Sequence, residues 1–317
     1  MTRVLVTGAK GFVGRAVCRR LQAARFDVVA AVRDDKATVE ADETRYLGDL
    51  TKSEDFDRHL SGCDVVVHLA ARVHVMNDPS TDPDVLYSEM NVAVTKRLAE
   101  AALRLGIKRF VFLSSIKVNG DETTLAPFTE ADPPNPQDAY GRSKQAAEQI
   151  LMGMATQTAL EPVILRVPLV YGPDVKANFL SLLKLCDSSM PLPFGAISEN
   201  RRSLIYVENL ADAIATAIDH PNAGGQIFLV SDGPPVSTAS LVAAIRAAFG
   251  RPNGLIPVPP GFLRFLLSLI GKSATTDRLT GSLEIDDSLI RQKLGWTPPA
   301  TFKEGLAATI GWYRDTR

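Results

Sequence analysis

Residues 3–14 read Arg3-Val4-Leu5-Val6-Thr7-Gly8-Ala9-Lys10-Gly11-Phe12-Val13-Gly14. A short run of apolar, β-branched residues leads into glycines at positions 8, 11 and 14, and an amphipathic stretch through Leu21 follows. This order predicts a strand, a tight turn and the start of a helix. Glycines let the backbone turn sharply and approach a ligand closely, and the N–H groups at a helix start favour phosphate. We therefore predict a dinucleotide-binding loop.

Beyond this stretch, short apolar runs alternate with helical patterns as far as residue 230. The predicted strands are 27–32, 46–47, 65–69, 109–114, 162–167 and 226–230, and the predicted helices are 85–105, 138–158 and 208–219. Alternation of this kind is typical of a doubly wound parallel sheet with right-handed crossovers. The sequence predicts an α/β fold of the Rossmann type, with ligands bound at the carboxyl ends of the strands.

The character of the sequence changes after Gly172-Pro173, where proline and glycine become frequent and the alternation is lost. We predict that residues 1–173 and 205–232 form the dinucleotide-binding domain. Residues 174–204 and 233–317 are predicted to form a smaller, interleaved substrate-binding lobe that closes over the carboxyl edge of the sheet.

Composition excludes several classes of protein. The net charge of −1 over 317 residues argues against a nucleic-acid partner, which usually leaves a basic footprint. Three scattered cysteines (Cys18, Cys63 and Cys186) suggest neither a disulfide framework nor a metal site. We expect a reduced, cytoplasmic setting, with no signal peptide ahead of the first strand. The apolar run 262–270 contains Arg264 and is too short to span a bilayer, so we expect no membrane insertion.

Tyr140 and Lys144 stand four residues apart at the start of a predicted helix and therefore share one face. A nearby ammonium stabilises a phenolate, so this spacing predicts a tyrosine with a lowered pKa that passes a proton near neutrality. Ser115 follows the strand 109–114, where a hydroxyl can meet a substrate oxygen. Without further signals, Tyr140 and Lys144 would be interpreted as an ordinary surface pair and Ser115 as a turn-forming serine. Beside the glycine loop, the three residues predict a catalytic site.

The combined motifs resemble those of an extended short-chain dehydrogenase/reductase of the NAD-dependent epimerase/dehydratase family, similar to UDP-glucose 4-epimerases. The resemblance spans nearly the whole chain. It rests on Gly8-x-x-Gly11-x-x-Gly14, Gly48-Asp49-Leu50, His68-Leu69-Ala70-Ala71, Asn91-Val92, Ser115-x-x-Val118-x-Gly120, Tyr140-x-x-x-Lys144 and Val170-Tyr171-Gly172-Pro173.

This resemblance implies roles for individual residues. Ser115, Tyr140 and Lys144 would be catalytic. The coenzyme would be bound by Gly8, Gly11, Phe12, Val13, Gly14, Arg33, Asp49, Leu50, Leu69, Ala70, Ala71, Tyr140 and Lys144. A UDP-sugar substrate would meet His74, Ser115, Asn178, Arg202 and Arg278. The alternative for each arginine is an ordinary solvated or salt-bridged side chain, and the alternative for His74 is an ordinary loop histidine. The family also implies a homodimer through the predicted helices 85–105 and 138–158.

Two departures from the family bear on the reaction. Relatives that dehydrate nucleotide sugars carry an Asp-Glu pair where this chain has Ile116-Lys117, which argues against a dehydratase. Asn119 stands where many relatives have tyrosine, and we expect it to change the pocket wall.

The coenzyme preference is predicted from the end of the strand 27–32. Arg33 replaces the acid that usually binds the ribose of NAD, so NADP(H) is favoured. NAD(H) remains possible because Asp34 and Asp35 could neutralise Arg33.

The local sequence around Ser115 and Tyr140 is similar to a subgroup of polysaccharide and O-antigen biosynthesis enzymes. Our leading hypothesis is reduction at C4 of a UDP-linked 4-keto hexose, such as a 2-acetamido-2,6-dideoxy sugar. The alternative is a UDP-hexose 4-epimerase that uses the same three residues on UDP-glucose or UDP-N-acetylglucosamine. A third hypothesis, a non-catalytic NADP(H)-sensing regulator, is disfavoured because Tyr140 and Lys144 are both present.

Overall fold

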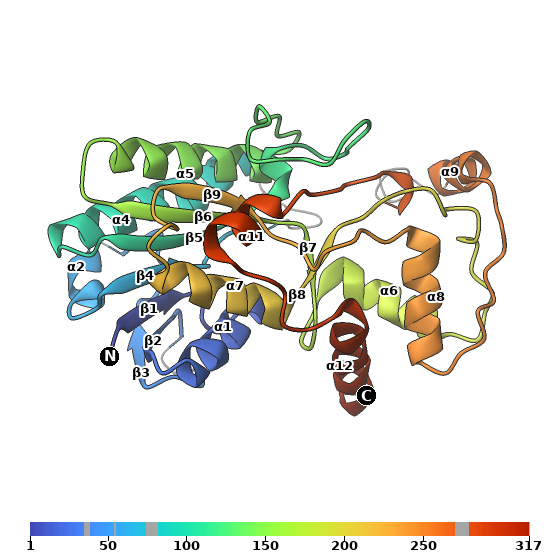
Figure 1. Ribbon diagram of the computed structural model, residues 1–317, viewed down its shortest axis with the longest axis horizontal. Coiled ribbons are helices and arrows are strands. Elements are labelled where there is room, and N and C mark those ends of the chain that lie inside the picture. The colour runs from blue at the N-terminus through green and yellow to red at the C-terminus, as the bar shows by residue number, and fades with distance from the viewer. Residues whose placement is uncertain (35–38, 54, 74–81, 270–278, 317) are drawn as a thin grey trace.

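A parallel β-sheet lies at the centre of the molecule (Figure 1). The computed structural model describes residues 1–34, 39–53, 55–73, 82–269 and 279–316. Among these residues, seven strands pair in the order β3-β2-β1-β4-β5-β6-β9, and every pairing is parallel. They are β1 (Arg3–Thr7), β2 (Asp27–Val32), β3 (Glu43–Tyr46), β4 (Val65–His68), β5 (Arg109–Ser115), β6 (Glu161–Val167) and β9 (Gln226–Leu229). The predicted doubly wound α/β fold is confirmed.

Helices cover both faces of the sheet, and alternate side chains of each strand point to opposite faces. On one face, Val4 and Val6 of β1 pack with α1 (Phe12–Ala23) and α7 (Val207–Asp219). On the other, Leu5 packs with α4 (Val94–Arg104) and α5 (Ala139–Ala155), and Figure 1 shows these two layers on either side of the strands. Burial on both faces explains why the central strands read as continuous apolar runs.

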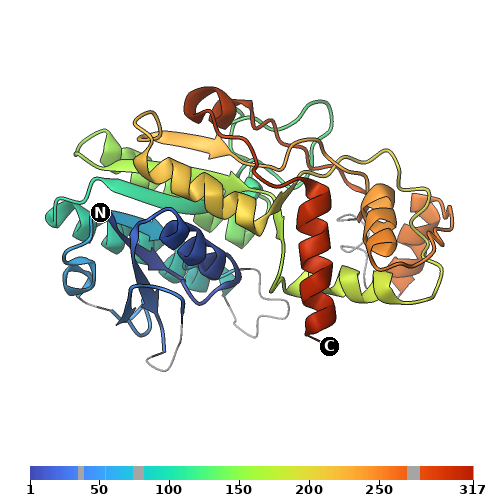
Figure 2. The ribbon, with the colours of Figure 1, turned by 60° about the horizontal axis from the view of Figure 1, so that its bottom comes forward.

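A second group of elements lies beyond one end of the sheet (Figures 1 and 2). It contains α6 (Ala177–Asp187), α8 (Thr238–Ala248), α9 (Pro260–Leu269) and α12 (Phe302–Asp315). A two-stranded parallel ladder of β7 (Leu169–Tyr171) and β8 (Leu204–Tyr206) connects it to the sheet.

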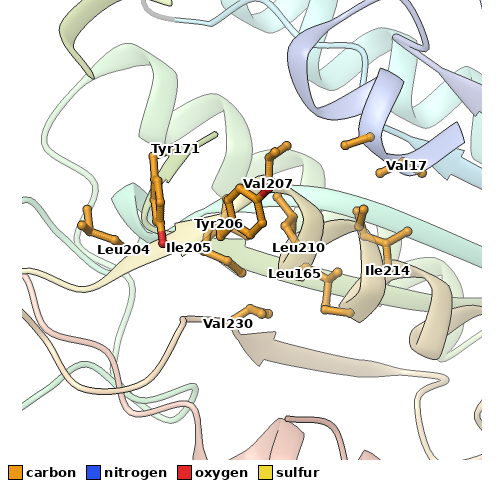
Figure 3. Packing of buried hydrophobic residues seen from close by; sticks show 14 of the residues in the cluster. Val17, Leu165, Tyr171, Leu204, Ile205, Tyr206, Val207, Leu210, Ile214 and Val230 are labelled. Carbon is orange, nitrogen blue, oxygen red and sulfur yellow. The ribbon is translucent and has the colours of Figure 1, made fainter. Parts of the chain in front are cut away.

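The hydrophobic core runs without interruption through this connection. Figure 3 shows Tyr206 beside Leu210 of α7, and the centre of the Tyr171 ring lies 5.6 Å from that of Tyr206. The Tyr171 ring also stacks on Phe179 of α6, with ring centroids 5.5 Å apart. The boundaries of the two predicted domains remain a prediction, but the two parts share one core.

The sequence missed some local features. β3 begins at Glu43 rather than Tyr46, because this edge strand is polar and half-exposed and so lacks an apolar signal. The predicted helix 85–105 is divided into α3 (Pro83–Tyr87), a π-helical stretch η1 (Ser88–Ala93) and α4. Among the described residues the remaining helical elements are short: α2 (Phe56–Leu60), the 3₁₀ turn η2 (Ile116–Val118) and α11 (Ser288–Leu294). No described helix has both the length and the apolar character needed to cross a membrane.

Candidate active site

A cavity of about 1170 Å³ opens at the carboxyl ends of the strands, where β1 ends at Thr7, β2 at Val32 and β5 at Ser115. The coenzyme and catalytic residues predicted from the sequence share its walls: Gly8, Gly11, Phe12, Val13, Gly14, Arg33, Asp49, Leu50, Leu69, Ala70, Ala71, Ser115, Tyr140 and Lys144. This edge of a doubly wound sheet is where such folds bind dinucleotides. The structure therefore brings the glycine loop and the tyrosine–lysine pair into one space.

The glycine loop has the shape that a pyrophosphate needs. Gly8 has a positive φ of 70°, and a Cβ there would lie 2.8 Å from the backbone nitrogen of Ala70. A Cβ on Gly14 would lie 2.1 Å from the carbonyl oxygen of Gly8, so only glycine lets α1 pack against the loop. Gly11 occupies the N-cap position of α1, where no side-chain cap forms, and the first-turn N–H groups stay available for an anion. These residues fit the diphosphate of a dinucleotide.

A buried histidine fixes the floor of the cavity. Thr7 Oγ1 accepts hydrogen bonds from the backbone nitrogens of Leu69 and Ala70, both at 3.2 Å, so its proton goes to His68 Nδ1 at 2.7 Å. His68 Nε2 then donates to Thr95 Oγ1 at 3.0 Å. Burial lowers the pKa of His68 to about 3, and the neighbouring Lys144 charge acts in the same direction. The neutral Nε2–H tautomer of His68 holds the Leu69–Ala70 backbone against β1.

Asn91 connects this floor to the helix that carries Tyr140. Its Oδ1 accepts from the Arg72 backbone nitrogen at 2.8 Å, and its Nδ2 donates to the Arg72 carbonyl at 3.0 Å. Nδ2 also lies 2.9 Å from Ser143 Oγ, which donates to the Tyr140 carbonyl at 2.7 Å. The π-helical stretch η1 thus places a buried amide between two walls of the cavity.

Ser115, Tyr140 and Lys144 meet at the end of β5. Lys144 Nζ donates to the Leu113 carbonyl at 2.8 Å and lies 4.4 Å from the Phe112 ring centre and 6.0 Å from that of Tyr140. A hydrogen bond joins the side chains of Ser115 and Tyr140. The arrangement provides a phenol, a hydroxyl and an ammonium at one place.

The protonation of this group differs from the sequence prediction. Burial raises the pKa of Tyr140 above its usual value, and the hydrogen bond with Ser115 opposes this only in part. Burial likewise lowers the pKa of Lys144 to about 7, against the favourable charge of Glu148. The predicted lowering of the tyrosine pKa by the lysine is wrong for this structure, because burial of Tyr140 disfavours its charged phenolate form and raises the pKa.

At the far end of the cavity, Asp49 is held by its neighbours. Its Oδ1 accepts from the Thr51 backbone nitrogen at 3.1 Å and from Thr51 Oγ1 at 2.9 Å, and these bonds, with the charge of Arg33, lower the pKa of Asp49. Arg33 Nη2 lies 3.4 Å from Asp49 Oδ2, while 81% of the Arg33 side chain is exposed. Arg33 therefore offers most of its guanidinium to whatever enters this end of the cavity.

The residues after Ser115 do not reach the cavity. Ile116 is buried, and Lys117 Nζ pairs with Asp121 at 2.8 Å and with Asp138, the N-cap residue of α5, at 3.1 Å. Asn119 is buried as well and accepts a hydrogen bond from Arg166. The expectation that Asn119 changes the pocket wall is wrong, because its side chain points into the protein interior.

Among the described residues, the structure does not bring the predicted substrate residues together in one cavity, as it does the coenzyme residues. Asn178 is exposed on the first turn of α6 and does not line the large cavity. Arg202 lines a second cavity of about 410 Å³, and its Nη1 donates to the Gly281 carbonyl at 3.0 Å. Burial lowers the pKa of Arg202, and Glu122 opposes this. His74 and Arg278 lie outside the described residues.

Sequence reasoning missed part of the cavity lining, including Lys10, Tyr46, Val73, Met90, Val167–Val170 and Val175–Ala177. Tyr46 and Val167 are each the last residue of a strand, so the rule that ligands bind at carboxyl ends could have found them. Lys10 lies within the glycine loop and Val170 begins the motif Val170-Tyr171-Gly172-Pro173, so both stood in stretches already singled out. The rest depend on tertiary packing and carry no local signal.

Similarity to known proteins agrees with this geometry. A family model described as "NAD dependent epimerase/dehydratase family" matches residues 4–231. A UDP-glucose 4-epimerase from Vibrio cholerae is 45% identical over 313 residues, which cover 96% of this chain and 94% of that protein. Two solved structures share the fold over nearly all of both chains. A Bacillus cereus UDP-N-acetylglucosamine 4-epimerase has a TM-score of 0.80, 22% identity and full coverage of both chains. MoeE5 in complex with UDP-glucuronic acid and NAD has a TM-score of 0.78, 26% identity and coverage of 99% and 100%.

The chain therefore belongs to the NAD-dependent epimerase/dehydratase family of the extended short-chain dehydrogenases/reductases, close to the UDP-glucose 4-epimerases.

Proposed function

We propose that this protein is a UDP-hexose 4-epimerase, the alternative hypothesis drawn from the sequence. The observation that carries this proposal is the single cavity in which the glycine loop meets Ser115, Tyr140 and Lys144. The similarity to the Vibrio cholerae UDP-glucose 4-epimerase, which extends over 96% of the chain, favours epimerisation over the other reactions of the family.

In this proposal, bound NAD would take a hydride from C4 of the sugar and return it to the other face of C4. The Tyr140 oxygen would accept the proton of the C4 hydroxyl and later give it back. Ser115 would hold the C4 oxygen through its hydroxyl, as it now holds Tyr140. Because burial raises the pKa of Tyr140, the phenol needs positive charge nearby to ionise, and Lys144 supplies an ammonium in the same cavity.

The surroundings of Ser115 do not support dehydration. That reaction needs acid and base groups beyond the tyrosine, because a proton is lost and water is expelled at neighbouring carbons. Ile116 is apolar and buried, and Lys117 is occupied by Asp121 and Asp138. Neither position supplies a carboxylate to the cavity.

A second candidate is the reductase that the sequence first favoured, with NADP(H) as the coenzyme. Arg33 is the observation behind it, because its largely exposed guanidinium lines the cavity directly after β2. A guanidinium in this place suits a 2′-phosphate. Asp49, 3.4 Å away, would compete for the same charge.

The substrate would extend from the cavity toward the second lobe, residues 174–204 and 233–317. We propose that Asn178 and Arg202 contact its diphosphate, since Arg202 is mostly buried and has one N–H bonded to the Gly281 carbonyl. A homodimer through the predicted helices 85–105 and 138–158 and a cytoplasmic location remain predictions.

Product analysis tests the proposal and separates the two candidates. The enzyme is incubated with UDP-glucose or UDP-N-acetylglucosamine and a small amount of NAD, and the sugars are separated by chromatography. The epimerase forms the C4 epimer with no net change in coenzyme absorbance. Stoichiometric oxidation of NAD(P)H by a UDP-linked 4-keto sugar, with no interconversion of the hexoses, would instead identify the reductase.

A further inference from the structure

A buried ion pair lies directly behind the cavity. Glu148 of α5 and Arg166 of β6 each have only 4% of their side chain exposed, and Arg166 Nη2 lies 2.6 Å from Glu148 Oε2. Arg166 Nε adds contacts of 3.1 and 3.2 Å to the two carboxylate oxygens. Burying two charges is expensive, and such a pair is weak evidence for stability. The desolvation cost of this buried pair is therefore consistent with a role other than stability.

The pair holds both ends of the segment that carries Ser115. At one end, Ser114 Oγ donates a hydrogen bond to Glu148 Oε1. At the other end, Arg166 Nη1 donates to Asn119 Oδ1 at 2.9 Å. Ser115 lies between these two attachments and faces the cavity. The position of its hydroxyl therefore depends on where the ion pair sits.

The attachment at Asn119 continues outward. Asn119 Nδ2 donates to the Thr129 carbonyl at 2.9 Å, so the same amide fixes the loop that follows Ser115. Asn119 is one of the positions at which this chain departs from many relatives, and its short side chain fits between Arg166 and the loop backbone. Both polar groups of the buried amide are thereby satisfied.

Glu148 also lies one helical turn from Lys144, and four residues is the spacing that places two side chains on one helix face. The groups that face Lys144 are Tyr140 and Glu148 of α5, the neutral His68 of β4, and the Phe112 ring and Leu113 carbonyl of β5. Arg166 of β6 lies on the other side of Glu148. Glu148 is the one anion in this set of described groups, and its charge favours the protonated lysine.

We propose that Glu148 and Arg166 are a positioning pair that holds the Ser115 hydroxyl in place, and that Glu148 of this pair favours the charged form of Lys144. Neither residue lines the cavity, and the pair acts through Ser114, Asn119 and Lys144. The inference rests on the proposed roles of Ser115, Tyr140 and Lys144, which the epimerase and the reductase share. A purely structural pair would stabilise the fold and leave the ionisation of Lys144 unchanged.

The charge effect is tested by Glu148→Gln, which keeps the shape of the side chain and an acceptor for Ser114. The protein is labelled with ¹⁵N-lysine, and the Lys144 Nζ signal, assigned with Lys144→Met, is followed against pH. Removal of the anion is expected to lower the midpoint of this titration by about one pH unit. Glu161→Gln is the matched control, because Glu161 of β6 pairs with Arg109 of β5 at 3.0 Å, at the opposite ends of the strands that carry Arg166 and Ser114. It should leave the midpoint unchanged.

The positioning effect is tested by the double variant Glu148→Gln/Arg166→Gln, which restores charge balance inside the protein and so guards against failure to fold. Its Lys144 midpoint is expected to lie closer to that of the unaltered protein than the Glu148→Gln midpoint does. Its kcat is nevertheless expected to fall about 10- to 100-fold, because the contact of Arg166 with Asn119 is lost and the segment that carries Ser115 is held only at its Ser114 end. The KM for the sugar nucleotide should change by less than about threefold, since the pair does not contact substrate.

The inference is overturned if Lys144 in the folded Glu148→Gln variant has the same titration midpoint as in the unaltered protein. It is also overturned if the folded double variant keeps full kcat. An unaltered protein that turns over no UDP-sugar would contradict the proposed function instead. The Lys144 titration needs no substrate, so it still decides whether Glu148 controls the lysine.

Discussion

The ammonium nitrogen of Lys144 lies 4.4 Å from the centre of the Phe112 ring. Phe112 belongs to β5, the strand that ends at Ser115 in the cavity wall. An ammonium over an aromatic face is attracted by the ring quadrupole, more strongly when both groups are buried. Lys144 also donates to the Leu113 carbonyl, so β5 fixes the position of the lysine. The Tyr140–Lys144 face of α5 is thus preorganised against the sheet.

Replacement of Tyr140 by phenylalanine should abolish most turnover. The variant keeps the ring, whose edge-to-face contact with Tyr87 has a centroid distance of 6.1 Å, and removes only the hydroxyl. Loss of proton transfer is expected to lower kcat about 10²- to 10⁴-fold, with the melting temperature nearly unchanged. Steady-state kinetics and thermal unfolding measure the two quantities. Normal turnover by the variant would refute the role of the phenol.

Gly14→Ala should disable coenzyme binding. The added methyl group would lie 2.1 Å from the Gly8 carbonyl oxygen, so the loop or α1 must move. Isothermal titration with NAD is expected to show at least a tenfold weaker Kd. The control is Gly153→Ala in the interior of α5, where a Cβ meets nothing within 4 Å. That substitution should stabilise the protein by about 0.5–1 kcal/mol. Equal binding by both variants would contradict the proposed place of the pyrophosphate.

Arg33 should decide how the protein distinguishes NADP from NAD. Its guanidinium is the positive group that ends β2 at the cavity wall, and Asp49 is its neighbour at 3.4 Å. Arg33→Ala is expected to reduce the preference for NADP over NAD by about tenfold, since a charge-assisted contact is lost. Titration of each coenzyme into both proteins gives the ratio. An unchanged ratio would show that Arg33 does not meet the 2′ position.

The buried His68 should make the protein less stable in acid. Its pKa is about 3 when folded and about 6.5 in an unfolded chain, so the unfolded chain binds the proton first as the pH falls. Stability is therefore lost below about pH 6.5, by at most about 1.4 kcal/mol for each pH unit down to pH 3. In urea unfolding, His68→Gln is expected to flatten this slope, and His220→Gln is the comparison variant. A slope unchanged in His68→Gln would contradict the neutral buried histidine.

The sequence was sufficient for the fold because its signals were local. The runs Val4–Val6 and Val65–Val67 alternate between two core clusters where strands were predicted from apolar runs, whereas the polar edge strand β3 gave no such signal. The site was predictable in the same way: Gly8, Asp49 and Tyr140 stand in recognisable motifs and meet at one cavity.

The sequence could not predict how burial and neighbouring charges combine to set the pKa of a side chain. Lys144 favours ionised Tyr140 when only spacing is considered, but burial of both groups reverses the direction of the tyrosine pKa. Asn119 faces inward because Arg166, 47 residues away in sequence, needs an acceptor there. Such pairings follow from tertiary packing and leave no local pattern.

The central claim is that hydride leaves C4 of a UDP-hexose and returns to the same carbon in this cavity. The most direct measurement uses UDP-glucose deuterated at C4, incubated with the enzyme in ordinary water, with the epimer analysed by mass spectrometry. Retention of the deuterium at C4 of the product is expected, because the returned hydride carries it. Loss of the deuterium to solvent, or failure of the unaltered protein to form the epimer, would contradict the account.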